Sequence, residues 1–338
     1  MGRNTILLSW LVAGVILLII LAAMSVMWGS TKIPLATVTD SLAAWISGQH
    51  QEAAGPLYRI IVDLRLPRVF LAIFVGGGLG LTGVLLQTTT HNDLADPFLF
   101  GLSSGASAGA VLVISVHGDT LGVWTLPLAS FAGGMIASVL VILLVRRMAR
   151  SGPEKIILAG LAISFVFTAL TNYLIFSGDQ RAAHSILFWS LGGLGLSRWQ
   201  NLPIAGFAFV VLFCYALINH RKFDALLAGE ATAKTLGVNP RRLQYSAFLV
   251  AAFSTAVFVS LSGIIGFIGL MVPHIARIIH GPLHKGLVLL SALLGGMVLL
   301  GSDLIARIIL APQELPVGII TTSAGGLFVF FLLMRQRR

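Results

Sequence analysis

The stretch from Arg65 to Pro97, RLPRVFLAIFVGGGLGLTGVLLQTTTHNDLADP, decides the fold class. Two arginines three positions apart open it, an apolar window covers 66–88, and a polar turn at 87–97 closes it. About 20 consecutive apolar residues are enough for a helix to cross the hydrocarbon core of a bilayer. The stretch therefore predicts a membrane-spanning helix with polar signatures at both ends.

The composition extends this prediction to the whole chain. Of its 338 residues, 57% are hydrophobic and 10% are charged, whereas a soluble domain carries about 25% charged residues. Long apolar runs, rather than alternating ones, exclude a closed barrel. Comparable windows fall at 6–28, 66–88, 98–116, 123–145, 156–176, 201–219, 245–263, 264–279, 287–308 and 317–334.

We therefore expect an all-α, polytopic membrane protein with about ten transmembrane helices, forming one domain over 1–338. The weakest boundary lies at Ser262 and Gly263, where the apolar character hardly breaks. Hydropathy alone thus allows eight to ten spans.

The basic residues orient these spans. If the N-terminus is cytoplasmic and ten helices cross, 15 of the 22 basic residues lie inside and 7 outside, as the positive-inside rule requires. Both termini and the 220–242 loop then face the cytoplasm. The net charge of +10 is explained by these loops, and we expect no nucleic-acid partner.

A polar island, GEATAKTLGVNPRR at 229–242, interrupts the apolar sequence. Its first half predicts a short amphipathic helix that ends at Gly237 and Pro240. Glu230 and Lys234 have the i, i+4 spacing of a helical ion pair, and the small alanines permit close docking. The residues alone leave two readings open, a docking element or an ordinary solvated loop helix.

No enzyme or metal motif stands out. The phosphate-binding pattern G-x-x-x-x-G-K-[ST] is absent, so this chain has no nucleotide site of that kind. His280 and His284 have an i, i+4 spacing, but Gly281 and Pro282 break the helix that would align them as ligands. We expect no catalytic residue, no metal and no cofactor bound by this chain.

Three arginines lie at the predicted outer face, Arg65, Arg68 and Arg307, against the positive-inside bias. An arginine at a span end is usually a snorkelling anchor. Its planar fork also suits two-pronged binding of carboxylates. Asp303, four residues before Arg307, is an alternative partner within the chain.

Together, five stretches resemble the iron-chelate and vitamin B12 permease family, the membrane subunits of type II ABC importers. They are RLPR at 65–68, the turn at 87–97, GEATAKTLGV at 229–238, GFIGLMVPHIARI at 266–278 and DLIARIILAPQELPVG at 303–318. The resemblance runs from about Arg65 to the C-terminus. His91 and Asp93 replace the usual arginine and proline of the family's turn, and 323–326 departs from its Gly-Ala-Pro turn.

The resemblance implies a type II ABC importer permease in the bacterial inner membrane. It implies a homodimer embedded in lipid, two copies of a separate ATPase that bind ATP and Mg, and a periplasmic substrate-binding protein. The cargo it implies is a bulky metal chelate, a ferric siderophore first, then haem, with cobalamin as the alternative.

The resemblance also assigns roles to residues. Docking of the binding protein falls to Arg65, Arg68 and Arg307. Coupling to the ATPase falls to the 220–242 loop, through Gly229, Glu230, Ala231, Thr232, Lys234, Leu236 and Gly237. The gate and pathway fall to Gln87, Asn92, Asp93, Leu94, Pro153 and Glu154, in the turns 92–97 and 151–155.

Two rival classes fit the residues less well. An ion-coupled secondary transporter normally needs ionisable residues at midspan, and Asp63 and Asp303 lie near the ends of their windows. A redox-enzyme subunit would need paired midspan histidines for haem, which the sequence lacks.

Overall fold

The computed structural model describes residues 3–48, 55–117, 124–147, 153–178 and 180–335. Every regular element in these ranges is helical, which confirms the all-α class. The elements are α1 (Arg3–Met27), α2 (Leu35–Ile46), α3 (Pro56–Arg59), the π-helix η1 (Ile60–Arg65), α4 (Leu66–Thr90), the 3-10 helix η2 (Pro97–Phe100), α5 (Leu102–His117), α6 (Thr125–Arg147), α7 (Pro153–Ser177), α8 (Gln180–Ser190), α9 (Leu202–Ile218), α10 (His220–Leu227), α11 (Glu230–Thr235), α12 (Pro240–Ser262), α13 (Ile268–His280), α14 (His284–Ile308) and α15 (Val317–Arg335).

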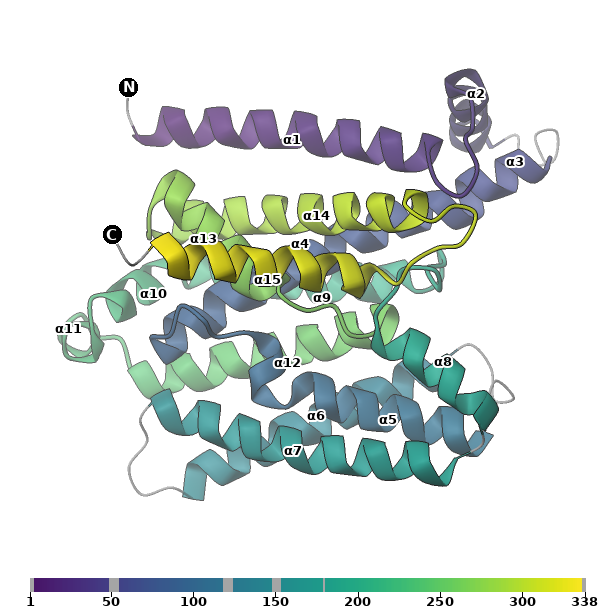
Figure 1. The fold of residues 1–338 in the computed structure, drawn as a ribbon. Helices are drawn as coiled ribbons and strands as arrows, with labels where there is room; N and C mark the ends of the chain where they lie inside the picture. The colour runs from purple at the N-terminus through teal and green to yellow at the C-terminus, as the bar shows by residue number, and fades with distance from the viewer. Residues whose placement is uncertain (1–2, 49–54, 118–123, 148–152, 179, 336–338) are drawn as a thin grey trace.

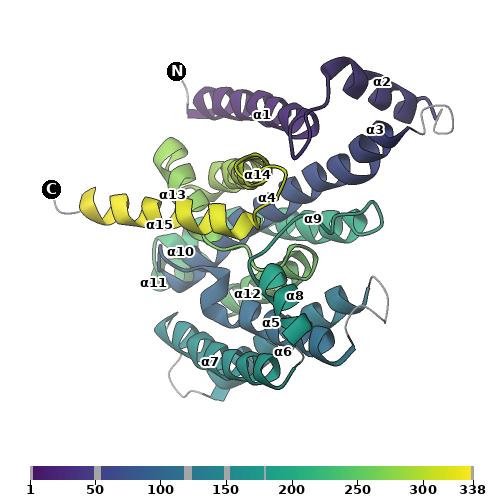
Figure 2. The same ribbon diagram turned by 45° about the vertical axis from the view of Figure 1, so that its right-hand side comes forward.

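The long helices form a bundle with two distinct ends (Figure 1). The short helices α10 and α11 lie at one end, together with the start of α1 and the end of α15. The helices α2 and α3 lie at the opposite end, and the rotated view keeps this separation (Figure 2). We call these the α11 end and the α2 end.

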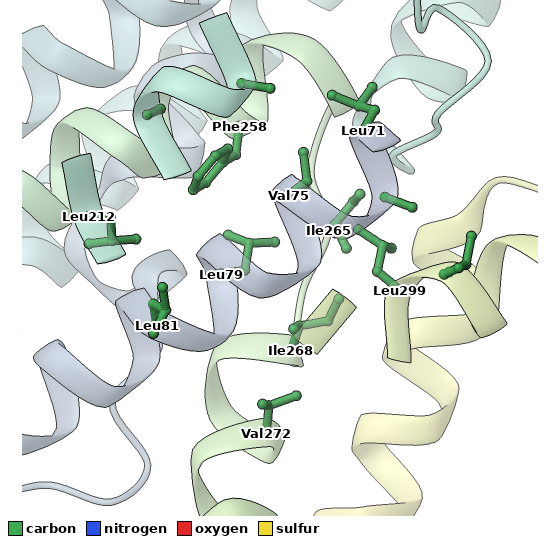
Figure 3. Close-up of a cluster of buried hydrophobic side chains, with 14 of the residues drawn as sticks. Leu71, Val75, Leu79, Leu81, Leu212, Phe258, Ile265, Ile268, Val272 and Leu299 are labelled. Atoms are coloured by element: carbon green, nitrogen blue, oxygen red, sulfur yellow. The ribbon is translucent and has the colours of Figure 1, made fainter. Parts of the chain in front are cut away.

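Helix α4 runs through the middle of the bundle, from α3 toward the α11 end (Figure 1). Figure 3 shows side chains of α4, including Leu71 and Val75, meeting those of the neighbouring helices. Phe258 of α12 and Leu299 of α14 are among these neighbours. Because lipid tails are as apolar as leucine, dispersion in such close contacts holds the helices together.

Glycines in α4 allow two backbones to approach it closely. A Cβ at Gly83 would overlap the backbone of Gly269 in α13, and a Cβ at Gly76 would overlap that of Gly295 in α14. Small residues at such crossings are typical of helix packing in lipid. The glycine-rich window of α4 is therefore a packing surface on two sides.

The expected count of about ten transmembrane helices is not confirmed. Seven helices of the described residues are long and apolar enough to cross a membrane, or eight if α9 and α10, bent by 59°, form one span. Helices α5 and α13 are shorter. The window at 264–279 yields only a 13-residue helix, because the chain is non-helical from Gly263 to Gly266 and Phe267 adopts a φ of 67°.

Candidate functional site

The polar island at the α11 end forms the expected short helix. Helix α11 spans Glu230–Thr235, between Gly229 with φ 107° and Gly237 with φ 76°. Both glycines have open space where a Cβ would be. Pro240 begins α12 at its first position, where a proline is well tolerated because that amide has no helical acceptor.

Helix α11 is mostly uncovered. Ala233 packs inward, whereas the predicted coupling residues Glu230, Ala231, Thr232, Lys234, Leu236 and Gly237 are exposed and Gly229 is half-buried. The expected ion pair of Glu230 with Lys234 is not among those formed in the described part of the chain. Glu230 instead accepts a hydrogen bond from Gln244, at 3.3 Å. The exposed side chains are mostly short and leave room for a partner to approach the backbone.

The turn after α4 is built by its own side chains. His91 takes a left-handed φ of 48°, the Asn92 side chain accepts from the amide of Leu94 at 2.9 Å, and Asp96 accepts from the amide of Phe98 at 2.9 Å. Such side-chain bonds from Asn and Asp are the usual means of fixing a tight turn. Asp93 and Leu94 remain exposed at its tip.

Gln87 and Arg277 attach this turn to α13. The Gln87 amide nitrogen donates to the carbonyl oxygens of Ala95 at 3.4 Å and Gly269 at 3.1 Å. The Gln87 amide oxygen accepts from the Arg277 guanidinium, which also pairs with Asp93 at 3.2 Å. Of the predicted gate residues, Gln87, Asn92, Asp93 and Leu94 thus lie in one cluster.

Arg277 was missed as a site residue, although it lies in the stretch 266–278 that carries the resemblance. Its signal was a basic residue on an otherwise apolar helix, but the sequence could not show which turn it reaches. Helix α7 begins at Pro153, and the side chains of Pro153 and Glu154 and the residues 151–152 lie outside the described part.

A cavity of about 350 Å³ adjoins the turn. Leu94 and Phe98 line it from the turn, Phe267 and Leu270 from the start of α13, and Thr322 from α15. Its wall is almost entirely apolar, and Asp96 is the one charged residue among the described residues that line it. The predicted gate residue Leu94 therefore faces a space that an apolar group could enter.

The outer arginines lie at the α2 end and are held by the chain itself. Arg65 is buried and donates to the carbonyl oxygens of Val26 and Thr31, both at 2.6 Å. Arg307 is buried and donates to the carbonyl oxygen of Ser25 at 3.1 Å. Carbonyls in the last turn of a helix lack helical donors and carry partial negative charge. The two arginines therefore cap the end of α1.

Asp303 sits at the centre of this cluster. It is fully buried and pairs with Arg68 at 2.8 Å and with Arg307 at 3.0 Å. The pairing with Arg307 confirms the alternative internal partner expected from the sequence. Arg68 also pairs with the partly exposed Glu314 at 2.7 Å. Its contact with the exposed Glu314 makes Arg68 the most accessible of the three arginines.

We predict that Asp303→Asn destabilises the chain by about 3–5 kcal/mol, the usual cost of removing one partner from a buried ion pair. The isosteric amide removes the carboxylate that pairs with the buried Arg307 and leaves Glu314 as the carboxylate beside Arg68. Glu314→Gln, which changes a partly exposed carboxylate, should cost under about 1 kcal/mol. Chemical unfolding of the purified variants in micelles measures both, and equal losses would contradict the central role of Asp303.

Comparisons with known proteins support the resemblance found in the sequence. Residues 17–335 match the FecCD transport family. The chain is 39% identical to the Fe(3+) dicitrate transport system permease protein FecD of Escherichia coli, over 83% of this chain and 86% of that protein. It is 33% identical to the hemin transport system permease protein HmuU of Yersinia pestis, over 95% and 94% of the two chains.

A solved structure has the same fold along nearly the whole chain. It is an inward-facing conformation of a transporter assigned to the metal-chelate type of ABC transporters, with a TM-score of 0.81 and 28% identity, covering 97% of this chain and 99% of that one. The resemblance noted in the five stretches is therefore matched over the full length. The chain belongs to the FecCD transport family.

Proposed function

We propose that this chain is the membrane permease of a binding-protein-dependent ABC importer for a bulky metal chelate, a ferric siderophore first and haem next. Its family consists of ABC importer permeases. Relatives named for ferric dicitrate and for hemin support a metal chelate as the cargo, and relatives named for cobalamin and vitamin B12 support cobalamin as the alternative. The observation that carries the proposal is the uncovered helix α11 at one end of a membrane bundle.

Helix α11 is the contact for a separate ATPase. A helix that inserts into a cleft of another protein needs a protruding backbone and small side chains, and Ala231 and Thr232 provide both. Two ATPase copies bind ATP and Mg and hydrolyse the nucleotide, so the permease itself has no enzymatic role. This arrangement places the α11 end and both termini in the cytoplasm of a bacterium, beneath its inner membrane.

Two copies of the chain enclose the pathway. Large apolar side chains on α7 and α15 are exposed, with Phe165 at 66%, Phe176 at 90% and Phe331 at 64%. Lipid and a second copy share the task of covering them, since contiguous exposed apolar surface marks such contacts. The turn 91–97 with Gln87, and the start of α7 at Pro153 and Glu154, then close the cytoplasmic side.

An ion-coupled transporter is the rival from another class. Such a protein needs a buried carboxylate that is available to its coupling ion. Asp303 is buried, but two arginines already pair with it. Asp96 is also buried, but it lies in the turn after the end of α4 rather than in the middle of a span. These positions favour ATP-driven import over ion coupling.

The coupling role predicts the effect of changing α11. Glu230→Arg with Gly237→Trp adds a reversed charge and a large side chain, and should abolish co-purification with the ATPase or uncouple transport. Asp40→Arg with Gly48→Trp is the matched control, since it makes the same two changes in exposed positions at the α2 end. If both double variants behave like wild type, α11 is only a loop helix.

The cargo is tested by uptake into proteoliposomes that contain the permease, the ATPase and the binding protein. We expect ATP-dependent uptake of at least one ferric siderophore, and a non-hydrolysable nucleotide serves as the control. Uptake of haem or cobalamin alone would reassign the cargo within the family. Failure of all three classes in a complex that hydrolyses ATP would contradict a metal-chelate importer.

The binding protein docks at the α2 end. Its carboxylates compete with Glu314 for Arg68, and the buried Arg65 and Arg307 support the site from beneath. We predict that Glu314→Gln raises the affinity of the binding protein at low salt, because it frees one edge of Arg68. At 1 M salt the gain should vanish, since charges are screened beyond about 3 Å. Asp40→Asn, another exposed acid at this end, is the control. Unchanged affinity with Glu314→Gln at low salt would leave the arginines a structural role only.

A further inference from the structure

His284 is buried at the start of α14 and bonded on both sides of its ring. Its backbone amide and Nδ1 both lie 2.8 Å from Oδ1 of Asp224 in α10. Its Nε2 lies 2.8 Å from the hydroxyl oxygen of Thr88 in α4. Only 1% of the residue is exposed. One side chain thus joins three helices that are remote in the sequence.

The positions of the protons in these hydrogen bonds follow from the groups that form them. An ionised carboxylate only accepts, so Nδ1 of His284 carries the proton that faces Asp224. Nε2 then accepts from the Thr88 hydroxyl when the ring is neutral. When the ring is charged, Nε2 donates to Thr88, whose own proton goes to the carbonyl oxygen of Val84 at 2.9 Å. The contact therefore exists in either charge state of the ring.

Aromatic packing holds the imidazole in place. The ring of Phe223, the residue before Asp224, lies 5.5 Å from the His284 ring, and Phe223 is fully buried. Tyr215 of α9 packs edge-on against Phe223 at 6.2 Å. A side chain confined in this way cannot move without moving its neighbours. The ring of His284 is therefore in direct packing contact with α10.

The two ends of the contact chain are the two regions that the proposed function needs to connect. Helix α10 leads directly into α11 through Ala228 and Gly229. Thr88 follows Gln87, which is bonded to the turn 91–97 and to α13. Gln244 forms a second connection beside these contacts. Its amide nitrogen lies 3.3 Å from both Oε1 of Glu230 and the carbonyl oxygen of Thr89.

We propose that the Asp224–His284–Thr88 contacts form a relay that transmits movement of the coupling helices to the gate turn. The inference rests on the proposed function, because it assumes that α11 binds the ATPase and that 91–97 is a gate. Within the relay, His284 and Thr88 are positioning residues that touch neither cargo nor nucleotide. A purely structural network would stabilise the same helices but would leave nucleotide-driven movement of the turn unchanged.

Thr88→Val isolates the relay, and Thr90→Val is its matched control. Both threonines are buried on the last turn of α4, and each hydroxyl oxygen lies within hydrogen-bond distance of a carbonyl oxygen four residues earlier, Val84 for Thr88 and Leu86 for Thr90. Both variants lose that contact and keep the side-chain shape. Only Thr88→Val also loses His284, so a difference between them reports the relay rather than the stability of α4.

The measurement uses the permease–ATPase complex in nanodiscs, with Cys214→Ser and a spin label at position 92 of each copy. We expect ATP with vanadate to change the distance between the labels in wild type and in Thr90→Val. Thr88→Val should lose most of this change while the complex still hydrolyses ATP, and Thr88→Ser, which retains the hydroxyl, should restore it. A full distance change in Thr88→Val would overturn the relay.

Asp224→Ala breaks the relay at its other end, where the Asp224 side chain is partly exposed. This variant provides the test if Thr88→Val does not fold. It should also lose most of the distance change, and a full change would overturn the relay. The wild-type result separates the two proposals. A wild-type complex without any nucleotide-dependent change would contradict the gate and coupling roles themselves, whereas a wild-type change that Asp224→Ala retains would contradict the relay alone.

Discussion

Backbone-to-backbone contact between α4 and its neighbours is the constraint on which the structure depends. Gly83 and Gly76 bring α13 and α14 so close to α4 that a single methyl group would overlap their main chains. In lipid there is no water to expel between apolar helices, so this closeness supplies much of the attraction. Helix α4, held by these contacts, also connects Arg68 near its start to the turn that follows its end.

The ion pairs of the described residues form a few compact clusters. At the α2 end, the buried carboxylate of Asp303 balances Arg68 and Arg307. Toward the α11 end, Arg277 pairs with Asp93, and His284 pairs with Asp224. An unbalanced buried charge would cost several kcal/mol, so the buried cluster around Asp303 fixes the start of α4 against the end of α14. The polar clusters thus position the ends of a bundle whose middle is held by apolar packing.

The local sequence was sufficient to predict some features of the structure but not others. The stretch 65–97 predicted a spanning helix followed by a polar turn, and α4 with its turn confirms this. The island at 229–242 predicted a short helix, which α11 confirms. Both features depend on neighbouring residues. The contacts of Thr88 with His284 and of Arg68 with Asp303 join positions 196 and 235 residues apart, and no local pattern reveals them. The count of about ten spans stays unconfirmed, since hydropathy does not detect a main-chain break such as the one before α13.

The two glycines that flank α11 affect which parts of the sequence can change. Gly229 and Gly237 hold left-handed backbone that other residues rarely adopt, and a Cβ at either position would meet open space. The short helix between them packs inward mainly through Ala233. Under the proposed coupling role, its outward residues can change to fit a different ATPase while the membrane helices keep their sequence.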